Sequence, residues 1–131
     1  MFLDLEYFME LGIMSKKLLV FISSPYTLGD QGENVRIQMD MFDRLNRMGF
    51  VPFAPLLYHF QHMVHPLDYD DWLDIDFAML ERCDVVLRLP GESGGADKEV
   101  AHAKIEGIPV VYSFYDLVEY ELSFVVNKSI T

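Results

Sequence analysis

The chain has 131 residues, 51% of them hydrophobic, which fits one domain with its own core and argues against a disordered chain. Its formal net charge is −11, from 21 acidic residues against 10 Lys plus Arg, and the lack of a basic stripe argues against binding nucleic acid polymers through their phosphates. No apolar run approaches the ~20 residues of a membrane helix, and the single cysteine excludes an intrachain disulfide, which fits the cytoplasmic location that we expect.

Residues 1–13 are acidic and mixed in polarity, so they lack the basic start and long apolar core of a signal peptide. Met14 precedes the first predicted strand and is a natural start. We therefore expect a single domain over residues 1–131, in which residues 1–16 are an extra N-terminal segment. This segment is either a short packed helix or an overextended reading frame.

Apolar patterning predicts alternating strands and helices in the first half of the chain. A buried strand at 18–22 is followed by a turn-rich loop at 28–32 and a helix at about 34–48. A short strand at 50–55 leads into a long loop that reaches Tyr69. Long loops in compact domains are often functional, so this loop is a candidate binding segment.

The second half of the chain is predicted to continue the alternation. Its elements are a helix at about 70–82, a strand at 85–89, a helix from its cap Ser93 to Gly107, a strand at 108–111 and a helix at about 114–124 capped by Ser113. The strands show unbroken apolar runs, as parallel strands covered on both faces do. We therefore expect a small doubly wound parallel α/β sheet, flavodoxin-like or Rossmann-like, with four or five strands and helices on both faces.

Ser93, Gly94 and Gly95 stand at the start of the helix between the last two predicted strands. The free N–H groups of a helix N-terminus attract anions, and glycines let a ligand approach the backbone closely. In open α/β sheets, ligands bind in the crevice at the carboxyl ends of the strands. We therefore expect these three residues to contact a substrate.

Two carboxylates are candidates for chemistry in that crevice. Glu99 lies early in the same helix and can point back toward the strand ends, although a solvated surface position is the alternative. Asp76 falls inside the apolar stripe of the preceding helix, which predicts a raised pKa and a role in the crevice. The alternative for Asp76 is a structural role as the cap of a nearby backbone group. Together the two would equip a site that cleaves a glycosidic bond.

Histidines are the remaining candidates. His59, His62 and His65 recur at every third position in a segment predicted to be irregular, so contact with a ligand or solvent is favoured over metal binding. His102 follows Glu99 on its helix and could hydrogen-bond to it. The chain has neither a P-loop motif nor a dinucleotide-binding fingerprint, and we expect no metal ion and no cofactor.

Three stretches carry a resemblance to a known family: FISSPYT at 21–27, Asp76 ahead of CDVV at 83–86, and SGGADKEVAHA at 93–103. In their joint order and spacing they resemble the nucleoside 2-deoxyribosyltransferase-like superfamily, over about residues 17–112. This superfamily includes the 2′-deoxynucleoside 5′-monophosphate N-hydrolases and related small uncharacterised domains. The resemblance implies the same α/β fold and an enzyme that acts on an N-glycosidic bond.

The resemblance also implies roles for individual residues. Glu99 stands at the position of the nucleophile that attacks the anomeric carbon, and Asp76 at that of an active-site aspartate. Ser93 is at a position where the N-hydrolases have a phosphate-binding serine and the transferases an aspartate that reads the base. The loop after the first strand, with Ser23, Ser24 and Tyr26, would complete the substrate site, with Ser24 near the phosphate.

The chain departs from the family pattern at two places. Where the family often has a tyrosine on its first strand, this chain has Val20, and Tyr26 is a possible replacement. The arginines of the hydrolases' first loop are also absent, since the loop at 26–33 is acidic. Hydrolysis and base exchange both stay open, and the alternative to an enzyme is a non-catalytic module that binds a nucleotide or nucleotide sugar.

The resemblance implies a homo-oligomer as well, because family members share active sites across subunit interfaces. Aromatic residues gather near both ends of this chain and are candidates for such an interface. They are Phe2, Tyr7, Phe8, Phe114, Tyr115, Tyr120 and Phe124. We expect a dimer or a larger assembly that binds a small nucleoside or nucleotide.

Overall fold

The computed structural model describes residues 17–130, and the side chains of residues 17–124. Its centre is a four-stranded, fully parallel sheet in the order β2-β1-β3-β4. The strands are β1 (Leu19–Ser23), β2 (Val51–Phe53), β3 (Val85–Arg88) and β4 (Val110–Val111). The predicted small doubly wound α/β fold is confirmed, and the extra N-terminal segment expected at 1–16 lies outside the described residues.

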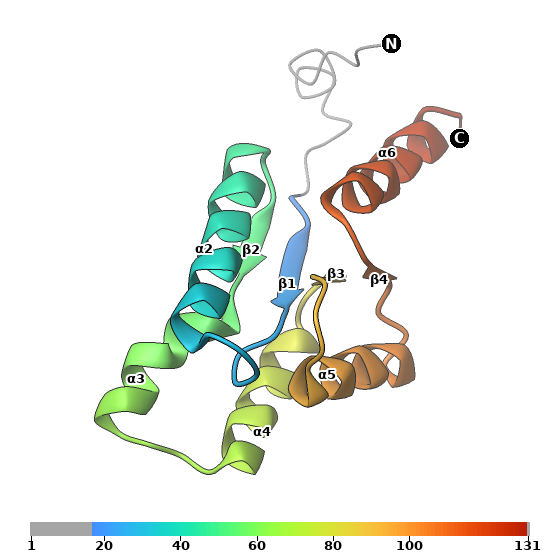
Figure 1. The fold of residues 1–131 in the computed structure, drawn as a ribbon. Helices are drawn as coiled ribbons and strands as arrows, with labels where there is room; N and C mark the ends of the chain where they lie inside the picture. Colours follow the sequence, from blue (N-terminus) through green and yellow to red (C-terminus); the bar gives the residue numbers. More distant parts are fainter. Residues whose placement is uncertain (1–16, 131) are drawn as a thin grey trace.

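Helices cover both faces of the sheet (Figure 1). They are α2 (Gln31–Arg47), α3 (His59–Val64), α4 (Tyr69–Leu80), α5 (Gly94–Ile105) and α6 (Phe114–Ile130), with a 3₁₀ turn, η1 (Pro55–Tyr58), before α3. Within residues 17–130, no helix has the length and apolarity that crossing a membrane requires.

Successive residues of the strands supply two separate cores, because side chains alternate between the faces of a sheet. Val20 and Ile22 pack with Leu45 of α2 and Leu117 of α6 on one face. Phe21 packs with residues of α4 and α5 on the other face. Both faces of β1 are therefore buried against other elements, which explains its unbroken apolar run.

The predicted caps are in place. Ser93 accepts a hydrogen bond from the N–H of Ala96 at 3.1 Å and begins α5, and Ser113 accepts one from Asp116 at 3.1 Å and begins α6. Gly107 ends α5 in a left-handed conformation, with φ of +73°, which glycine adopts without strain.

Three predicted boundaries were wrong. Helix α2 begins at Gln31 rather than near 34, because the Asp30 side chain caps the N–H of Glu33 at 3.0 Å. The long loop predicted to reach Tyr69 contains η1 and α3, so the histidine segment is helical rather than irregular. Pro55 occupies the first turn of η1, where its missing N–H costs nothing. Helix α6 extends beyond 124 to Ile130.

The order of the strands reverses between β1 and β3, and this reversal creates a crevice. From β1 the chain continues to α2 on one face of the sheet, and from β3 to α5 on the other face. The two loops nevertheless touch at Gly91, since a Cβ added there would lie 2.7 Å from Cγ of Pro25. Open α/β sheets bind ligands at such a switch point, outside the carboxyl ends of the strands.

Candidate functional site

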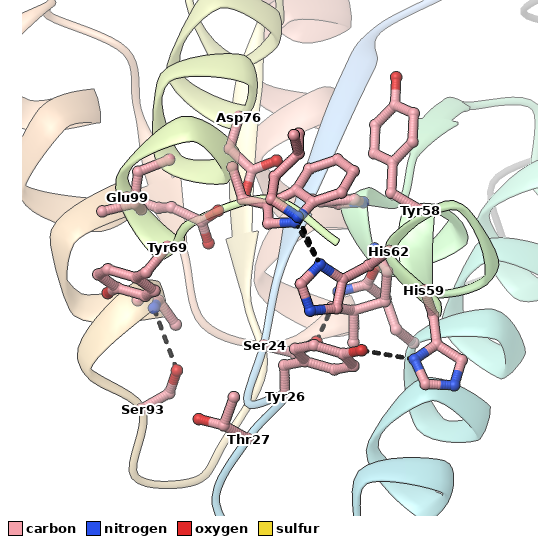
Figure 2. A pocket seen from close by; sticks show the side chains of 18 residues that line it. Ser24, Tyr26, Thr27, Tyr58, His59, His62, Tyr69, Asp76, Ser93 and Glu99 are labelled. Atoms are coloured by element: carbon pink, nitrogen blue, oxygen red, sulfur yellow. Dashed lines mark hydrogen bonds between the residues drawn. The ribbon is translucent and has the colours of Figure 1, made fainter. Parts of the chain in front are cut away.

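A pocket of about 300 Å³ lies at this switch point. Its walls come from the loops after β1 and β3, from α2, η1 and α3, and from the facing sides of α4 and α5. Figure 2 shows the main lining side chains, which converge from both faces of the sheet. The volume suits a small ligand rather than a polymer.

Most of the predicted site residues meet in this pocket. Its lining includes Ser24, Tyr26, Asp76, Ser93, Gly95 and Glu99. Ser23 lies behind the lining and contacts Glu99, whereas Gly94 is exposed and does not line the pocket. Residues from three separate segments of the chain therefore come together as the sequence predicted.

Glu99 is enclosed at the base of the pocket and only 6% exposed. Its Oε1 accepts a 2.8 Å hydrogen bond from the hydroxyl of Ser23 at the end of β1. Burial raises its pKa well above the ordinary range, and the neighbouring carboxyl of Asp76 raises it further. The surface position considered for Glu99 is therefore wrong.

Asp76 reaches the same point from α4 (Figure 2). Burial raises its pKa to about 6, as its place in the apolar stripe predicted, and a hydrogen bond with Glu99 partly offsets this rise. Two interacting carboxyl groups cannot both ionise cheaply, because the second charge would repel the first. Near neutral pH the pair therefore holds one proton between its two members.

Arg88 is the cation next to this pair. It stands opposite Ser23 in the β1–β3 register, and its positive charge favours the ionised form of Glu99. Its guanidinium is held by the carbonyl of Gly91 at 2.8 Å and by the carboxylate of Asp97 at 3.3 Å. Ser23 and Arg88 both lower the pKa of Glu99, but burial and the Asp76 carboxyl raise it more, so the shared proton rests on Glu99.

Gln38 of α2 fixes the loop after β1. It is 1% exposed, and its Nε2 donates to the carbonyl of Ile22 at 3.2 Å and to Oγ of Ser24 at 2.7 Å. Its Oε1 accepts the N–H of Leu56 at 2.8 Å. Because Ser24 Oγ is an acceptor in this contact, its own proton is free to be donated toward a ligand.

Ser93 is in the same situation on the opposite side of the pocket. Its oxygen accepts the N–H of Ala96 as the cap of α5, so its hydroxyl proton is also available. Two hydroxyl donors and a helix N-terminus suit an acceptor-rich group such as a phosphate. None of the described residues that line the pocket is Lys or Arg, so an anion here would have no charged partner in the lining.

An aromatic wall closes the remaining side of the pocket. We define it as Tyr58, His62 and Trp72; the Tyr58 and Trp72 ring centroids lie 5.5 Å apart, and those of His62 and Trp72 lie 5.7 Å apart. Next to it, the hydroxyl of Tyr26 shares a 2.5 Å hydrogen bond with Nδ1 of His59. A flat apolar ligand can stack against such a surface.

Several of these residues were not identified from the sequence. Gln38 could have been found, because it is a polar residue on the apolar stripe of its helix, the same signal that pointed to Asp76. Tyr58 and Trp72 gave no signal of their own, since aromatic residues are common in cores. Arg88 lies within the buried strand predicted at 85–89, where no pattern marks it as a site residue. Val20, which replaces the family tyrosine, lies in the core formed with α2 and α6, not in the pocket lining.

The other histidines lie away from the pair. His102 does not make the expected hydrogen bond to Glu99; its ring stacks on Phe77 with centroids 4.2 Å apart, and its Nε2 bonds to Glu81 at 2.8 Å. His65 is exposed and does not line the pocket. Among the described residues, the group with metal-ligand spacing is Glu81, His102 and Glu106, outside the pocket.

The fold and the site define a small α/β domain with a paired-carboxylate pocket at the switch point of a parallel sheet. The chain belongs to the family described as Domain of unknown function (DUF7768), whose model matches residues 18–113. The comparison with curated proteins gives no match. The family description names no activity.

Proposed function

We propose that this protein cleaves the N-glycosidic bond of a nucleoside or nucleoside 5′-monophosphate, with Glu99 as the nucleophile. The observation that carries the proposal is the Asp76–Glu99 pair, two carboxyl groups that line one pocket of nucleoside size and have raised, mutually dependent pKa values. One member of such a pair can attack while the other delivers the proton.

The pair supplies each step of the reaction. The shared proton first moves from Glu99 to Asp76, while Ser23 and Arg88 stabilise the resulting Glu99 carboxylate. An oxygen of this carboxylate then bonds to C1′ while the C1′–N bond breaks, and the electron pair of that bond leaves with the base. Asp76 gives its proton to the departing base. Water then attacks C1′, passes a proton to Asp76 and frees Glu99 as a carboxylate; in base exchange, a second base takes the place of water.

The close approach of the two carboxyl groups favours this covalent route over a direct attack by water. An inverting glycosidase keeps its carboxyl groups roughly 6.5–9.5 Å apart so that a water fits between them. Asp76 and Glu99 line the same pocket and each shifts the pKa of the other, which indicates a close approach rather than a gap that holds a water. The stabilisation of the Glu99 anion by Ser23 and Arg88 also suits a nucleophile.

The resemblance to the nucleoside 2-deoxyribosyltransferase-like superfamily supports the same assignment. It gives Glu99 the nucleophile's position and Asp76 that of an active-site aspartate. The free hydroxyls of Ser24 and Ser93 support a substrate with acceptor oxygens near the helix N-terminus.

A second candidate is a module that binds a nucleotide or nucleotide sugar without cleaving it. Its supporting observation is the enclosure of Glu99, which is 6% exposed and already bonded to Ser23. On this alternative the carboxyl pair joins β1, α4 and α5, and the pocket serves binding alone.

The deciding experiment is a panel of ribonucleosides, 2′-deoxynucleosides and their 5′-monophosphates, with base release followed by chromatography. We expect at least one member to release its base, and Asp76→Asn to lower turnover by about 100-fold or more with little change in Tm. Binding of panel members without any release would replace the proposed enzyme by the binding module.

A further inference from the structure

The tautomer of His62 is set by its neighbours. Nδ1 of His62 accepts a 2.7 Å hydrogen bond from the indole N–H of Trp72 and a 3.3 Å bond from the backbone N–H of Leu67. Indole and backbone N–H groups can only donate. Nδ1 is therefore unprotonated, and the ring carries its proton on Nε2.

The Nε2–H group of His62 is therefore a hydrogen-bond donor that a ligand in the pocket could engage. His62 lines the pocket, and Figure 2 shows its ring among the lining side chains, with the Trp72 bond marked. Among the residues that the structure describes, Nε2 has no hydrogen-bond partner. A half-buried donor at a pocket surface gains most from an acceptor on a ligand.

The surroundings of this donor indicate which part of a ligand it meets. His62 belongs to the aromatic wall with Tyr58 and Trp72, on a different helix from the paired carboxylates. A flat ring placed against this wall would present its edge to Nε2–H. The wall and the donor together match a heterocycle with a carbonyl oxygen or an unprotonated ring nitrogen.

We infer that His62 is a specificity-determining residue, which donates a hydrogen bond from Nε2 to an acceptor on the edge of the bound nucleobase. The inference rests on the proposed function for the identity of the heterocycle. The hydrogen bond from His62 selects bases that carry an acceptor at that edge over analogues in which C–H replaces the acceptor.

The test measures binding of free bases by calorimetry, so it does not depend on turnover. Hypoxanthine is compared with purine, which lacks the carbonyl, and with 7-deazahypoxanthine, which lacks a ring nitrogen; uracil is compared with pyrimidin-2-one. His62→Phe keeps a flat ring but removes both ring nitrogens. His62→Gln supplies an amide N–H that can donate to the ligand and an amide oxygen that can accept from Trp72. His65→Phe is the matched control, because His65 is a neighbouring exposed histidine outside the pocket.

We expect a parent base to bind the native protein more tightly than one of its analogues. His62→Phe should weaken the parent by about tenfold and leave that analogue unchanged, the size expected for one desolvated hydrogen bond. His62→Gln should restore most of the discrimination, and His65→Phe should change nothing. Equal weakening of parent and analogue by His62→Phe, or no binding of any base, would overturn the inference.

Failure of the His62 inference can be distinguished from failure of the proposed function. If nucleosides are cleaved but His62→Phe keeps the discrimination, the inference fails and the enzyme stands. If no nucleoside is cleaved while His62 still selects between parent and analogue, the enzymatic function fails and the base-recognition role stands. Should His62→Phe fail to fold, His62→Gln and the native comparison of parent with analogue still decide the question.

Discussion

Ser23 and Glu99 join the end of β1 to the first turns of α5, through a 2.8 Å hydrogen bond from the serine hydroxyl to Oε1 of the glutamate. The same hydroxyl lies 3.4 Å from the carbonyl of Ala96, so its single proton is directed mainly to Glu99. A buried carboxylate fixed by a strand residue cannot turn toward solvent. This contact holds one oxygen of Glu99 and leaves the other for Asp76 or a ligand.

Replacing Glu99 by Gln tests the nucleophile directly. The amide keeps the size of the side chain but cannot form the ester to C1′, so base release should fall at least about a thousandfold. Because a buried acid is removed, Tm should stay equal or rise. Glu106→Gln, at the exposed C-terminal end of α5, is the control and should release base normally. Full activity of Glu99→Gln would exclude the covalent route.

The stability of the protein should fall as the pH rises through the titration of the carboxyl pair. Burial raises the pKa of Asp76 to about 6 and that of Glu99 well above its ordinary range, so the folded protein retains protons that the unfolded chain loses. The contribution of the protonated pair to the free energy of unfolding is complete below about pH 4. It is lost as the pH rises through the raised pKa values.

The double variant Asp76→Asn/Glu99→Gln removes both titrations. The difference in Tm, variant minus native protein, should be roughly 2–8 °C larger at pH 8 than at pH 4.5. Thermal unfolding of both proteins across this pH range gives this difference in Tm. The other titrating groups are the same in both proteins, so their effects cancel. A difference that does not vary with pH would contradict the shared, raised pKa values.

The sequence predicted the fold well because the fold depends on local patterns. The unbroken apolar runs of β1 and β3 and the caps Ser93 and Ser113 are readable without any partner. Asp76 was found because a carboxylate on an apolar stripe is costly without a purpose.

What the sequence could not predict depends on contacts between distant segments. The Nε2–H tautomer of His62 follows from Trp72, which belongs to another helix. The position of Arg88 beside Ser23 follows from strand register, which no local pattern sets. Helix α3 is only six residues long, and helices of that length need tertiary contacts to form.

Gln38 should be important for stability as well as for the position of Ser24. Gln38→Leu would leave the carbonyl of Ile22 and the N–H of Leu56 without this partner. We expect a loss of about 2–4 kcal/mol in the free energy of unfolding, measured in urea. Ser24→Ala should cost less, about 1 kcal/mol, since Gln38 keeps its two backbone bonds. Equal losses for the two variants would show that the network does not act through Gln38.

We also predict a dimer or larger assembly in solution, with α6 at the interface. Phe114 packs into the core, whereas Tyr115 is 73% exposed and Phe124 44% exposed; Phe2, Tyr7 and Phe8 lie outside the described residues. Tyr115→Glu should shift the protein toward monomer in light scattering at micromolar concentration. Phe60→Glu is the control, because Phe60 is equally exposed, at 72%, on α3. A monomeric native protein would contradict the prediction.

The last prediction concerns the 5′-phosphate. Ser93 offers a free hydroxyl proton beside the N–H groups of α5, which suits a phosphate. A helix N-terminus contributes only about 0.3–1 kcal/mol at exposed sites and up to about 2 kcal/mol when partly buried. The acidic loop at 26–33 and the net charge of −11 oppose a dianion, but salt screens charges beyond about 8 Å, so the local donors should decide.

We therefore expect kcat/KM to favour a monophosphate over its nucleoside by a modest factor of about 3–30, since no Lys or Arg is among the described lining residues. Ser93→Ala should remove most of this preference. Ser113→Ala is the matched control, because it removes the same kind of helix cap from α6, away from the pocket, and so separates lost stability from lost recognition. A nucleoside used equally well, with no change in Ser93→Ala, would exclude the phosphate site and favour base exchange over hydrolysis.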